Sequence, residues 1–226
     1  IRNSVGYPQL NVKIAGSHAG ISTGEDGATH QCIEDLALMR EIPGMVVINP
    51  CDAIEAKQAV KAALEHNGPV YLRFCRLATE NIHGEDFKFE LGKGVEIKEG
   101  NDATIVATGI VLEFALKAAE MLKAEGISAR VVDIHTIKPI DRDIIVKAAK
   151  ETGAIVTVEE HNVYGGLGSA VCEALAGVCP VPVVRHGVED IYGKSAPAKE
   201  LLDYYKLNAE GICEKVKIAL SMKIDN

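Results

Sequence analysis

Histidines, acidic residues and glycines gather in one short stretch of the sequence, between His18 and Gln31. It contains two histidines, three glycines and the acidic pair Glu25-Asp26. The imidazoles of His18 and His30 can each donate a hydrogen bond to a hydroxyl group or accept one from it, and Asp26 adds a fixed acceptor. Loop amides next to a helix N-terminus favour an anionic or polyhydroxy ligand. These residues therefore predict a binding loop for such a ligand.

The neighbouring elements place this loop at an edge where ligands bind. We expect it to leave a strand at residues 12–17 and to enter a helix at residues 30–40 that Thr29 caps. Ligands of open α/β sheets bind at the carboxyl ends of the strands. In the first turn of that helix, the dipole would favour the neutral imidazole of His30. The alternative is a glycine-rich loop whose histidines only cap turns.

Two arginines follow the strand expected at residues 70–74. Arg73 and Arg76 lie at its carboxyl end, where a guanidinium group is suited to bidentate recognition of a phosphate. Taken alone, either arginine could equally be a salt-bridged surface residue. Together with the His18–His30 loop, they make a phosphorylated polyol a coherent ligand.

A second glycine-rich stretch, Gly165-Gly-Leu-Gly168, follows a strand that ends at Glu159 and Glu160. It lacks the spacing of a dinucleotide-binding fingerprint, and glycines at a strand-to-helix turn often serve close packing. We therefore expect a structural role for these glycines, and a role for Glu159 and Glu160 at an interface.

Neither the histidines nor the cysteines show the spacing of a metal site. His30 and Glu34 would share a helix face, but no third ligand converges on them, so a surface pair is the better interpretation. The six cysteines never fall in C-x-x-C spacing and mostly lie in apolar stretches. This favours buried free thiols in a reducing compartment over disulfides or a zinc site. The sequence thus predicts no metal site.

Short apolar runs alternate with longer segments of helical period, which is typical of βαβ units. Two such series predict an α/β fold of two three-layer α/β/α domains with mostly parallel sheets. The first series has expected strands at 12–17, 45–48 and 70–74, and helices at 30–40 and 52–66. The second has an expected hairpin at 95–107 turning at Gly100-Asn101, strands at 129–133, 154–159 and 181–185, helices at 112–124, 142–151 and 167–176, and C-terminal helices.

The periodicity fails between Ala78 and Gly94, where the sequence becomes polar. We expect a first domain at residues 1–78, a linker at 79–93 and a second domain at 94–226. Three parallel strands with helices make a poor core on their own, and the first series begins abruptly at Ile1. We therefore expect part of the first domain to precede Ile1 or to lie on another chain.

The composition excludes several classes of function. The 226 residues carry 24 Lys and Arg against 32 Asp and Glu, a net charge of -8, and 47% of them are hydrophobic. Disorder is excluded, and the acidic balance argues against binding to nucleic acid or to an anionic membrane. The apolar runs are far shorter than the ~20 residues that span a bilayer, and no signal pattern opens the chain. We expect a soluble, cytoplasmic protein.

Several motifs resemble the transketolase family over essentially the whole chain. The most specific is residues 16–31, where a His, a Gly-Glu-Asp-Gly loop and Thr-His-Gln follow one another at the family's spacing. The other similar stretches are residues 49–52, 136–141 and 159–168. The resemblance implies a truncated pyrimidine-binding-type domain followed by the family's C-terminal domain. It also implies transfer of a two-carbon ketol unit from a ketose phosphate to an aldose phosphate.

The resemblance assigns roles to individual residues. His18, Asp26 and His30 would contact substrate hydroxyls or phosphate. His30 would also lie near the reactive end of the cofactor and help proton transfers there, which makes it the expected catalytic residue. An arginine after the strand at 70–74 would bind phosphate; we match it to Arg76, with Arg73 as the alternative.

The cofactors implied are thiamine diphosphate and Mg2+, bound mainly by segments outside this chain. The family's activating glutamate, its stacking aromatics and its Gly-Asp-Gly then Asn motif match no residue of this sequence. We therefore expect activity to need residues before Ile1 and an N-terminal transketolase domain or subunit, in a homodimer or heterotetramer. The implied ligands are the sugar phosphates of pentose phosphate metabolism.

Other functions fit parts of the sequence. A 1-deoxy-xylulose-5-phosphate synthase or a 2-oxoacid dehydrogenase β subunit shares the two-domain plan, but in the synthase an Arg commonly stands where this chain has His18. A non-catalytic assembly module is the rival from another class. Such a module has no need of His18, Asp26 and His30 around a glycine loop, which favours transketolase.

Overall fold

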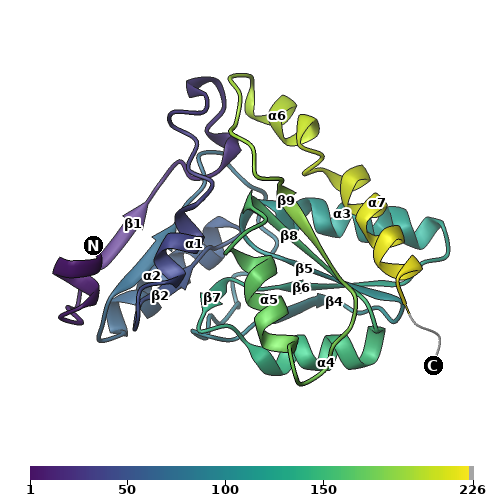
Figure 1. Cartoon of the computed structure of the whole chain (residues 1–226), viewed down its shortest axis with the longest axis horizontal. Helices are drawn as coiled ribbons and strands as arrows, with labels where there is room; N and C mark the ends of the chain where they lie inside the picture. The colour runs from purple at the N-terminus through teal and green to yellow at the C-terminus, as the bar shows by residue number, and fades with distance from the viewer. Residues whose placement is uncertain (224–226) are drawn as a thin grey trace.

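A computed structural model describes residues 1–223 and contains two β-sheets with helices on both faces (Figure 1). The first sheet has the strand order β1-β3-β2-β7 and the second β4-β6-β5-β8-β9. Each sheet is parallel except for one antiparallel edge strand, β7 in the first and β4 in the second. The predicted α/β fold with two mostly parallel sheets is therefore confirmed.

The elements have the following bounds. The strands are β1 (Lys13–Gly16), β2 (Val46–Ile48), β3 (Val70–Arg73), β4 (Val95–Lys98), β5 (Ala103–Ala107), β6 (Ala129–Asp133), β7 (Thr136–Lys138), β8 (Ile155–Asn162) and β9 (Val183–Val188). The α-helices are α1 (Asp35–Arg40), α2 (Ala53–Glu65), α3 (Leu112–Ala124), α4 (Arg142–Thr152), α5 (Leu167–Leu175), α6 (Ala198–Tyr204) and α7 (Ala209–Ser221). Short π and 3-10 turns span Arg2–Gly6, Ile21–Asp26 and Gly109–Val111.

Alternation of side chains explains how helices cover both faces of the first sheet. Val47 and Tyr71 pack with Leu36 of α1 on one face. The residues on either side of them in β2 and β3 point the other way and pack against Ala59 and Ala63 of α2. Successive strand residues point to opposite faces, so two short buried strands pack against one helix on each face.

The second sheet is also buried on both faces. Every residue of β5 and β6 is buried, as expected for central parallel strands. Helices α3 and α7 lie on one side of the sheet, and α4 and α5 lie on the other (Figure 1). No helix in the part of the chain that the structure describes is long and apolar enough to cross a bilayer.

The two sheets share apolar cores. One cluster joins Leu36, Val47 and Tyr71 of the first series to Val106 and Ile137 of the second. Strand β7 also connects the two series, because it belongs to the second series by sequence but pairs with β2 of the first sheet. Its Lys138 Nζ donates to the carbonyl oxygens of Arg40 and Ile42, at 2.6 and 2.7 Å. The fold therefore interlocks the two series.

The hairpin expected at residues 95–107 does not form. β4 pairs antiparallel with β6, and β5 lies between β6 and β8. The amides of Asn101 and Asp102 donate to Ser128 O instead of closing a two-residue turn. A run as apolar as β5 is stabilised by a neighbour on each side, and this outweighs the local turn signal.

Three further elements differ from those expected from the sequence. The helix expected at residues 30–40 begins only at Asp35, because residues 31–34 are extended or bent. β7 was not predicted, since three residues give too short a pattern. The last strand runs over Val183–Val188 and so ends three residues beyond the expected 181–185.

Two helix N-caps hold the segment between the series. Asp52 caps α2 by accepting from Glu55 N, and its second oxygen accepts from the amides of Ile82 and His83. Asp141 caps α4 by accepting from Asp143 N and Ile144 N, and its second oxygen accepts from Gly94 N at 3.0 Å. Residues 79–93 contain no helix or strand, yet both ends are fixed.

We predict that Asp141→Ala destabilises the chain. An N-cap is worth about 1 kcal/mol, and the lost contact to Gly94 adds to it, so the melting temperature should fall by about 2–4 °C or more. Thermal unfolding followed by circular dichroism measures the shift. Asp143→Ala, which removes a carboxylate of the same helix turn but no cap, is the matched control. Equal shifts for the two variants would contradict the capping role.

Candidate functional site

The predicted binding loop leaves the carboxyl end of β1 and crosses the top of the first sheet. His18 has a φ of 62°, a left-handed conformation that is uncommon outside glycine. Gly20, with a φ of 81°, lies so close to Glu160 that a Cβ atom would fall 2.3 Å from the Glu160 carboxyl carbon. Only glycine fits there, because both the backbone conformation and the space exclude a side chain.

The four predicted site residues are exposed at this edge. Asp26 and Arg76 are brought together, with Asp26 Oδ2 3.6 Å from Arg76 Nη1. Arg76 also donates to Thr23 O and lies 3.7 Å from the Glu25 carboxylate. His18 Nδ1 lies 3.0 Å from Ser17 Oγ, and His30 Nδ1 lies 3.0 Å from Thr29 Oγ1. Within residues 1–223, neither imidazole forms a hydrogen bond or ion pair with Asp26 or Arg76.

The two candidate arginines differ sharply in their surroundings. Arg73 is buried, and its Nε lies 2.8 Å from Asp35 Oδ2. Its Nη2 donates to Glu160 O at 2.9 Å. Arg76 keeps 41% of its side chain exposed. Of the two, only Arg76 can reach a ligand without breaking buried contacts.

The structure corrects the expected surroundings of His30. Because α1 begins at Asp35, His30 lies in a turn rather than in the first turn of a helix, and Thr29 is not an N-cap. The His30 amide donates to Gly27 O. His30 and Glu34 therefore share no helix face, and the helix-dipole argument for His30 does not apply.

Residues of the second series contact the loop on its buried side. Buried Gln31 donates to the carbonyl oxygens of Ile21, Gly24 and Lys194, so it ties both arms of the loop to the chain before α6. Ser195 Oγ donates to Glu25 O at 2.5 Å. The loop is thus fixed underneath while His18, Asp26 and His30 remain accessible.

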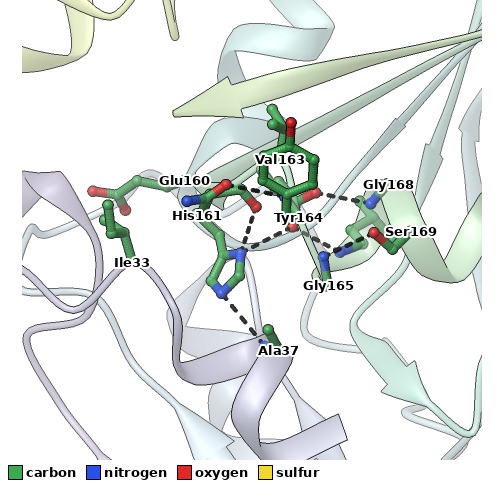
Figure 2. Close-up of polar contacts among 12 residues, drawn as sticks. Ile33, Ala37, Glu160, His161, Val163, Tyr164, Gly165, Gly168 and Ser169 are labelled. Atoms are coloured by element: carbon green, nitrogen blue, oxygen red, sulfur yellow. Dashed lines mark hydrogen bonds and ion pairs between the residues drawn. The ribbon is translucent and has the colours of Figure 1, made fainter. Parts of the chain in front are cut away.

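The buried side chain of Glu160 also holds the loop. Its Oε1 accepts from Ser22 N, and its carboxylate reaches toward the loop beside Ile33 (Figure 2). Burial raises the pKa of Glu160 to about 7, although Arg73 and the Ser22 amide oppose the shift. One buried carboxyl group therefore joins β8 to the start of the loop.

The second glycine-rich stretch serves the packing of α5. Glu159 accepts from the amides of Leu167 and Gly168, at 2.7 and 2.8 Å. A Cβ on Gly166 would fall 2.0 Å from Glu159 Oε2. His161 of β8 points toward α1, and its Nε2 accepts from Ala37 N of that helix at 3.4 Å (Figure 2). The geometry gives these residues a structural use, as the sequence suggested.

The cysteines are less uniform than expected. None of the six, all of which lie within residues 1–223, forms a disulfide, and Cys51 and Cys213 are buried. Cys32 and Cys172 are exposed, so the expectation of buried thiols is wrong for these two. Partial burial and the nearby Asp35 carboxylate still raise the pKa of Cys32, which disfavours its reactive thiolate.

Two family models match the chain. Residues 1–81 match the pyrimidine binding domain of transketolase, and residues 92–212 match the transketolase C-terminal domain. The chain belongs to the transketolase family. It corresponds to the C-terminal section of these thiamine diphosphate-dependent enzymes, as the resemblance implied.

Individual transketolases are similar over nearly all of the chain. A protein of Methanocaldococcus jannaschii assigned as a transketolase C-terminal section is 48% identical over 96% of this chain and 68% of its own length. One of the subunits of the apulose-4-phosphate transketolase of Phocaeicola vulgatus is 42% identical over 95% of this chain and 69% of its own. The chain thus spans about two thirds of each relative.

A solved structure matches the fold closely. It is a split-gene transketolase, described as an inactive β4 tetramer, with a TM-score of 0.91 and 50% identity. The match covers 99% of this chain and 71% of that one. The arrangement of the two sheets is therefore shared with that transketolase.

Sequence reasoning missed the residues that support the loop. Gln31 belongs to the family motif but had no predicted role, and Glu160 was expected only at an unspecified interface. Asp35, the partner of Arg73, was not singled out. The available signal was the polar character of these residues within apolar runs, since a buried charge or amide requires partners.

We predict a distinct pH dependence for Glu160→Gln. The folded pKa is about 7 against 4.5 for an ordinary glutamate, so between these values the folded chain binds a proton that the unfolded chain lacks. The free energy of unfolding should therefore fall as pH rises across this window. In Glu160→Gln, whose amide oxygen can still accept from Ser22, the fall should be smaller.

Denaturant unfolding at several pH values between about 4.5 and 7 tests this prediction. Glu173→Gln, which alters an exposed carboxylate, is the control and should keep the slope of the unmodified chain. A Glu160→Gln slope equal to that of the unmodified chain would overturn the assignment.

Proposed function

We propose that this chain is the C-terminal subunit of a split transketolase. Such an enzyme moves a two-carbon ketol unit from a ketose phosphate to an aldose phosphate. The observation that supports it most directly is the loop between His18 and His30, which hydrogen bonds hold on its buried side. Its exposed imidazoles and carboxylate suit sugar hydroxyls, and Arg76 beside Asp26 suits a phosphate.

The names of relatives support the subunit and the substrate class. One relative is a subunit of a transketolase named for apulose-4-phosphate, a sugar phosphate. The split-gene transketolase structure with 50% identity is described as an inactive β4 tetramer. By analogy, we propose that this chain works with an N-terminal subunit in a hetero-oligomer.

The residues present do not fit thiamine diphosphate and its Mg2+. At the loop, the Glu25 and Asp26 carboxylates lie 3.7 and 3.6 Å from the Arg76 guanidinium, so a cation there would meet a positive charge. The sequence also lacks the Gly-Asp-Gly then Asn motif. We propose that the cofactor is held mainly by the partner.

Each exposed residue has a proposed role toward the substrate. Arg76 pairs with the phosphate and releases its weak contacts to Glu25 and Asp26, which are long for charge-assisted hydrogen bonds. Asp26 and His18 bind hydroxyl groups. His30 is the proposed proton donor and acceptor at the donor carbonyl, because its imidazole is accessible and its backbone is fixed.

We predict that activity requires the partner. Ketol transfer from xylulose 5-phosphate should be absent for this chain with thiamine diphosphate and Mg2+. It should appear when a form of the chain that also carries the family's activating glutamate is combined with an N-terminal subunit from the same cell. Turnover by the chain alone would refute the proposal. Pyruvate consumption by the reconstituted complex, without ketol transfer, would instead support the sibling synthase.

We predict that Arg76→Ala lowers kcat/KM for a phosphorylated substrate in the reconstituted enzyme by about 10- to 100-fold, since a hydrogen bond to a charged group is worth about 1.5–3 kcal/mol. Steady-state kinetics measures the loss. For a substrate without phosphate, the same variant should change kcat/KM little. Arg2→Ala removes an exposed arginine away from the loop and serves as the control.

Asp26→Ala tests the hydroxyl-binding role separately. It should lower kcat/KM for phosphorylated and unphosphorylated sugars alike, because the lost contact is to a hydroxyl. Glu41→Gln, an exposed carboxylate at the end of α1, is its control. If Asp26→Ala leaves ketol transfer unchanged, the proposed substrate role of the loop is abandoned.

A further inference from the structure

Four side chains with metal-binding atoms converge in the interior, away from the loop. They are Cys51, Glu55, His83 and Asp133, all buried, with one potential ligand atom of each lying within 4.8 Å of the others. Three separate parts of the chain supply them. Cys51 and Glu55 flank the start of α2, His83 lies in the segment between the series, and Asp133 ends β6.

The two distances from His83 to the carboxylates fit ligands around an ion better than a simple ion pair. His83 Nε2 lies 3.3 Å from Asp133 Oδ2 and 3.5 Å from Glu55 Oε1. Charge-assisted N–H···O contacts are shorter, at about 2.7–2.9 Å, and one N–H cannot point at two oxygens equally well. For metal–ligand bonds of about 2.0–2.1 Å, neighbouring ligand atoms of a tetrahedron lie about 3.4 Å apart.

Two carboxylate oxygens in the cluster lack a hydrogen-bond donor among residues 1–223. Glu55 Oε1 and Asp133 Oδ1 are both buried without such a partner, on side chains that are fully buried. The other oxygen of Glu55 accepts from Cys51 N at 2.7 Å, which turns Oε1 toward His83. An unpaired buried carboxylate oxygen is costly, so its position calls for a cation.

The charges of the four residues also favour a bound cation. Two carboxylates face one imidazole, so the buried groups carry an excess negative charge when the carboxylates are ionised. A divalent ion bound to two carboxylates, a neutral imidazole and the Cys51 thiolate reduces the net charge of these groups from -3 to -1.

We propose that Cys51, Glu55, His83 and Asp133 form a structural binding site for one divalent transition-metal ion of the Zn2+ type. A thiol, an imidazole and two carboxylates are the borderline ligand set that such ions prefer, whereas Mg2+ prefers oxygen ligands with water. The ring of Phe87 stacks on His83 at 3.9 Å and closes one side. The ion joins both series to the segment between them, independently of the proposed catalytic role.

Metal analysis of the purified full chain tests the proposal. After dialysis against ZnCl2 and then metal-free buffer, elemental analysis should find about one Zn2+ per chain. Cys51→Ser should lower the affinity for Zn2+ at least about 10-fold, in line with the sensitivity of such sites to their surroundings. Cys213→Ser, which alters another buried thiol, is the matched control and should keep the ion.

Spectroscopy separates ligand loss from misfolding. Co2+ added to the metal-free chain should produce a near-ultraviolet thiolate-to-cobalt band, present in Cys213→Ser and absent in Cys51→Ser, while circular dichroism stays unchanged. Zn2+ should also raise the melting temperature of the metal-free chain, and His83→Ala should abolish that rise. Less than a tenth of an equivalent of bound Zn2+, no cobalt band, or equal Zn2+ affinity in the two serine variants would overturn the site.

Discussion

The burial of one charged group, the Arg73 guanidinium, constrains much of the structure. A buried guanidinium must be paired and hydrogen-bonded, and this one draws its partners from three places. Asp35 at the start of α1 supplies a carboxylate, Cys32 a carbonyl oxygen at 3.4 Å, and Glu160 a carbonyl oxygen at 2.9 Å. Burial alone would raise the pKa of Asp35, but Arg73 and the Tyr71 hydroxyl together hold that pKa below its ordinary value. Arg73 therefore fixes three segments relative to one another: the end of β3, the exit of the loop and the end of β8.

The same junction also holds the glycine-rich loop in place. The Glu160 carboxylate accepts from the Ser22 amide on the loop, close to the Gly20 backbone that leaves room for it. Gln31 closes the far arm against Lys194 O. The second series thus acts as the support of a site whose exposed residues all belong to the first. Exposed side chains on such a support keep their spacing without needing to contact one another, which the proposed binding of a flexible sugar phosphate requires.

The sequence predicted what depends on local periodicity and local chemistry. The βαβ order, the positions of most strands and helices, and the loop with His18, Asp26 and His30 could all be found from neighbouring residues. The failures have a common cause, which is that distant partners decided the outcome. Local turn residues suggested a hairpin before β5, but burial between β6 and β8 prevailed, and β7 is a strand only because β2 lies beside it. For the same reason, Gln31 and Cys51 had no visible role before their partners from other segments were known.

The division between buried and exposed polar groups also bears on where chemistry can occur. In the interior, polar side chains are used to join the series: Asp52 and Asp141 hold the intervening segment, and Arg73 locks the sheet ends. At the loop, by contrast, His18, Asp26, His30 and Arg76 all face solvent. The proposed ketol transfer would pass through reactive intermediates that must be shielded from water, and an open edge of a sheet cannot provide that shielding alone. A second surface would then have to close over the loop. The open edge and the poor fit of the loop to the cofactor therefore both support the proposed partner subunit.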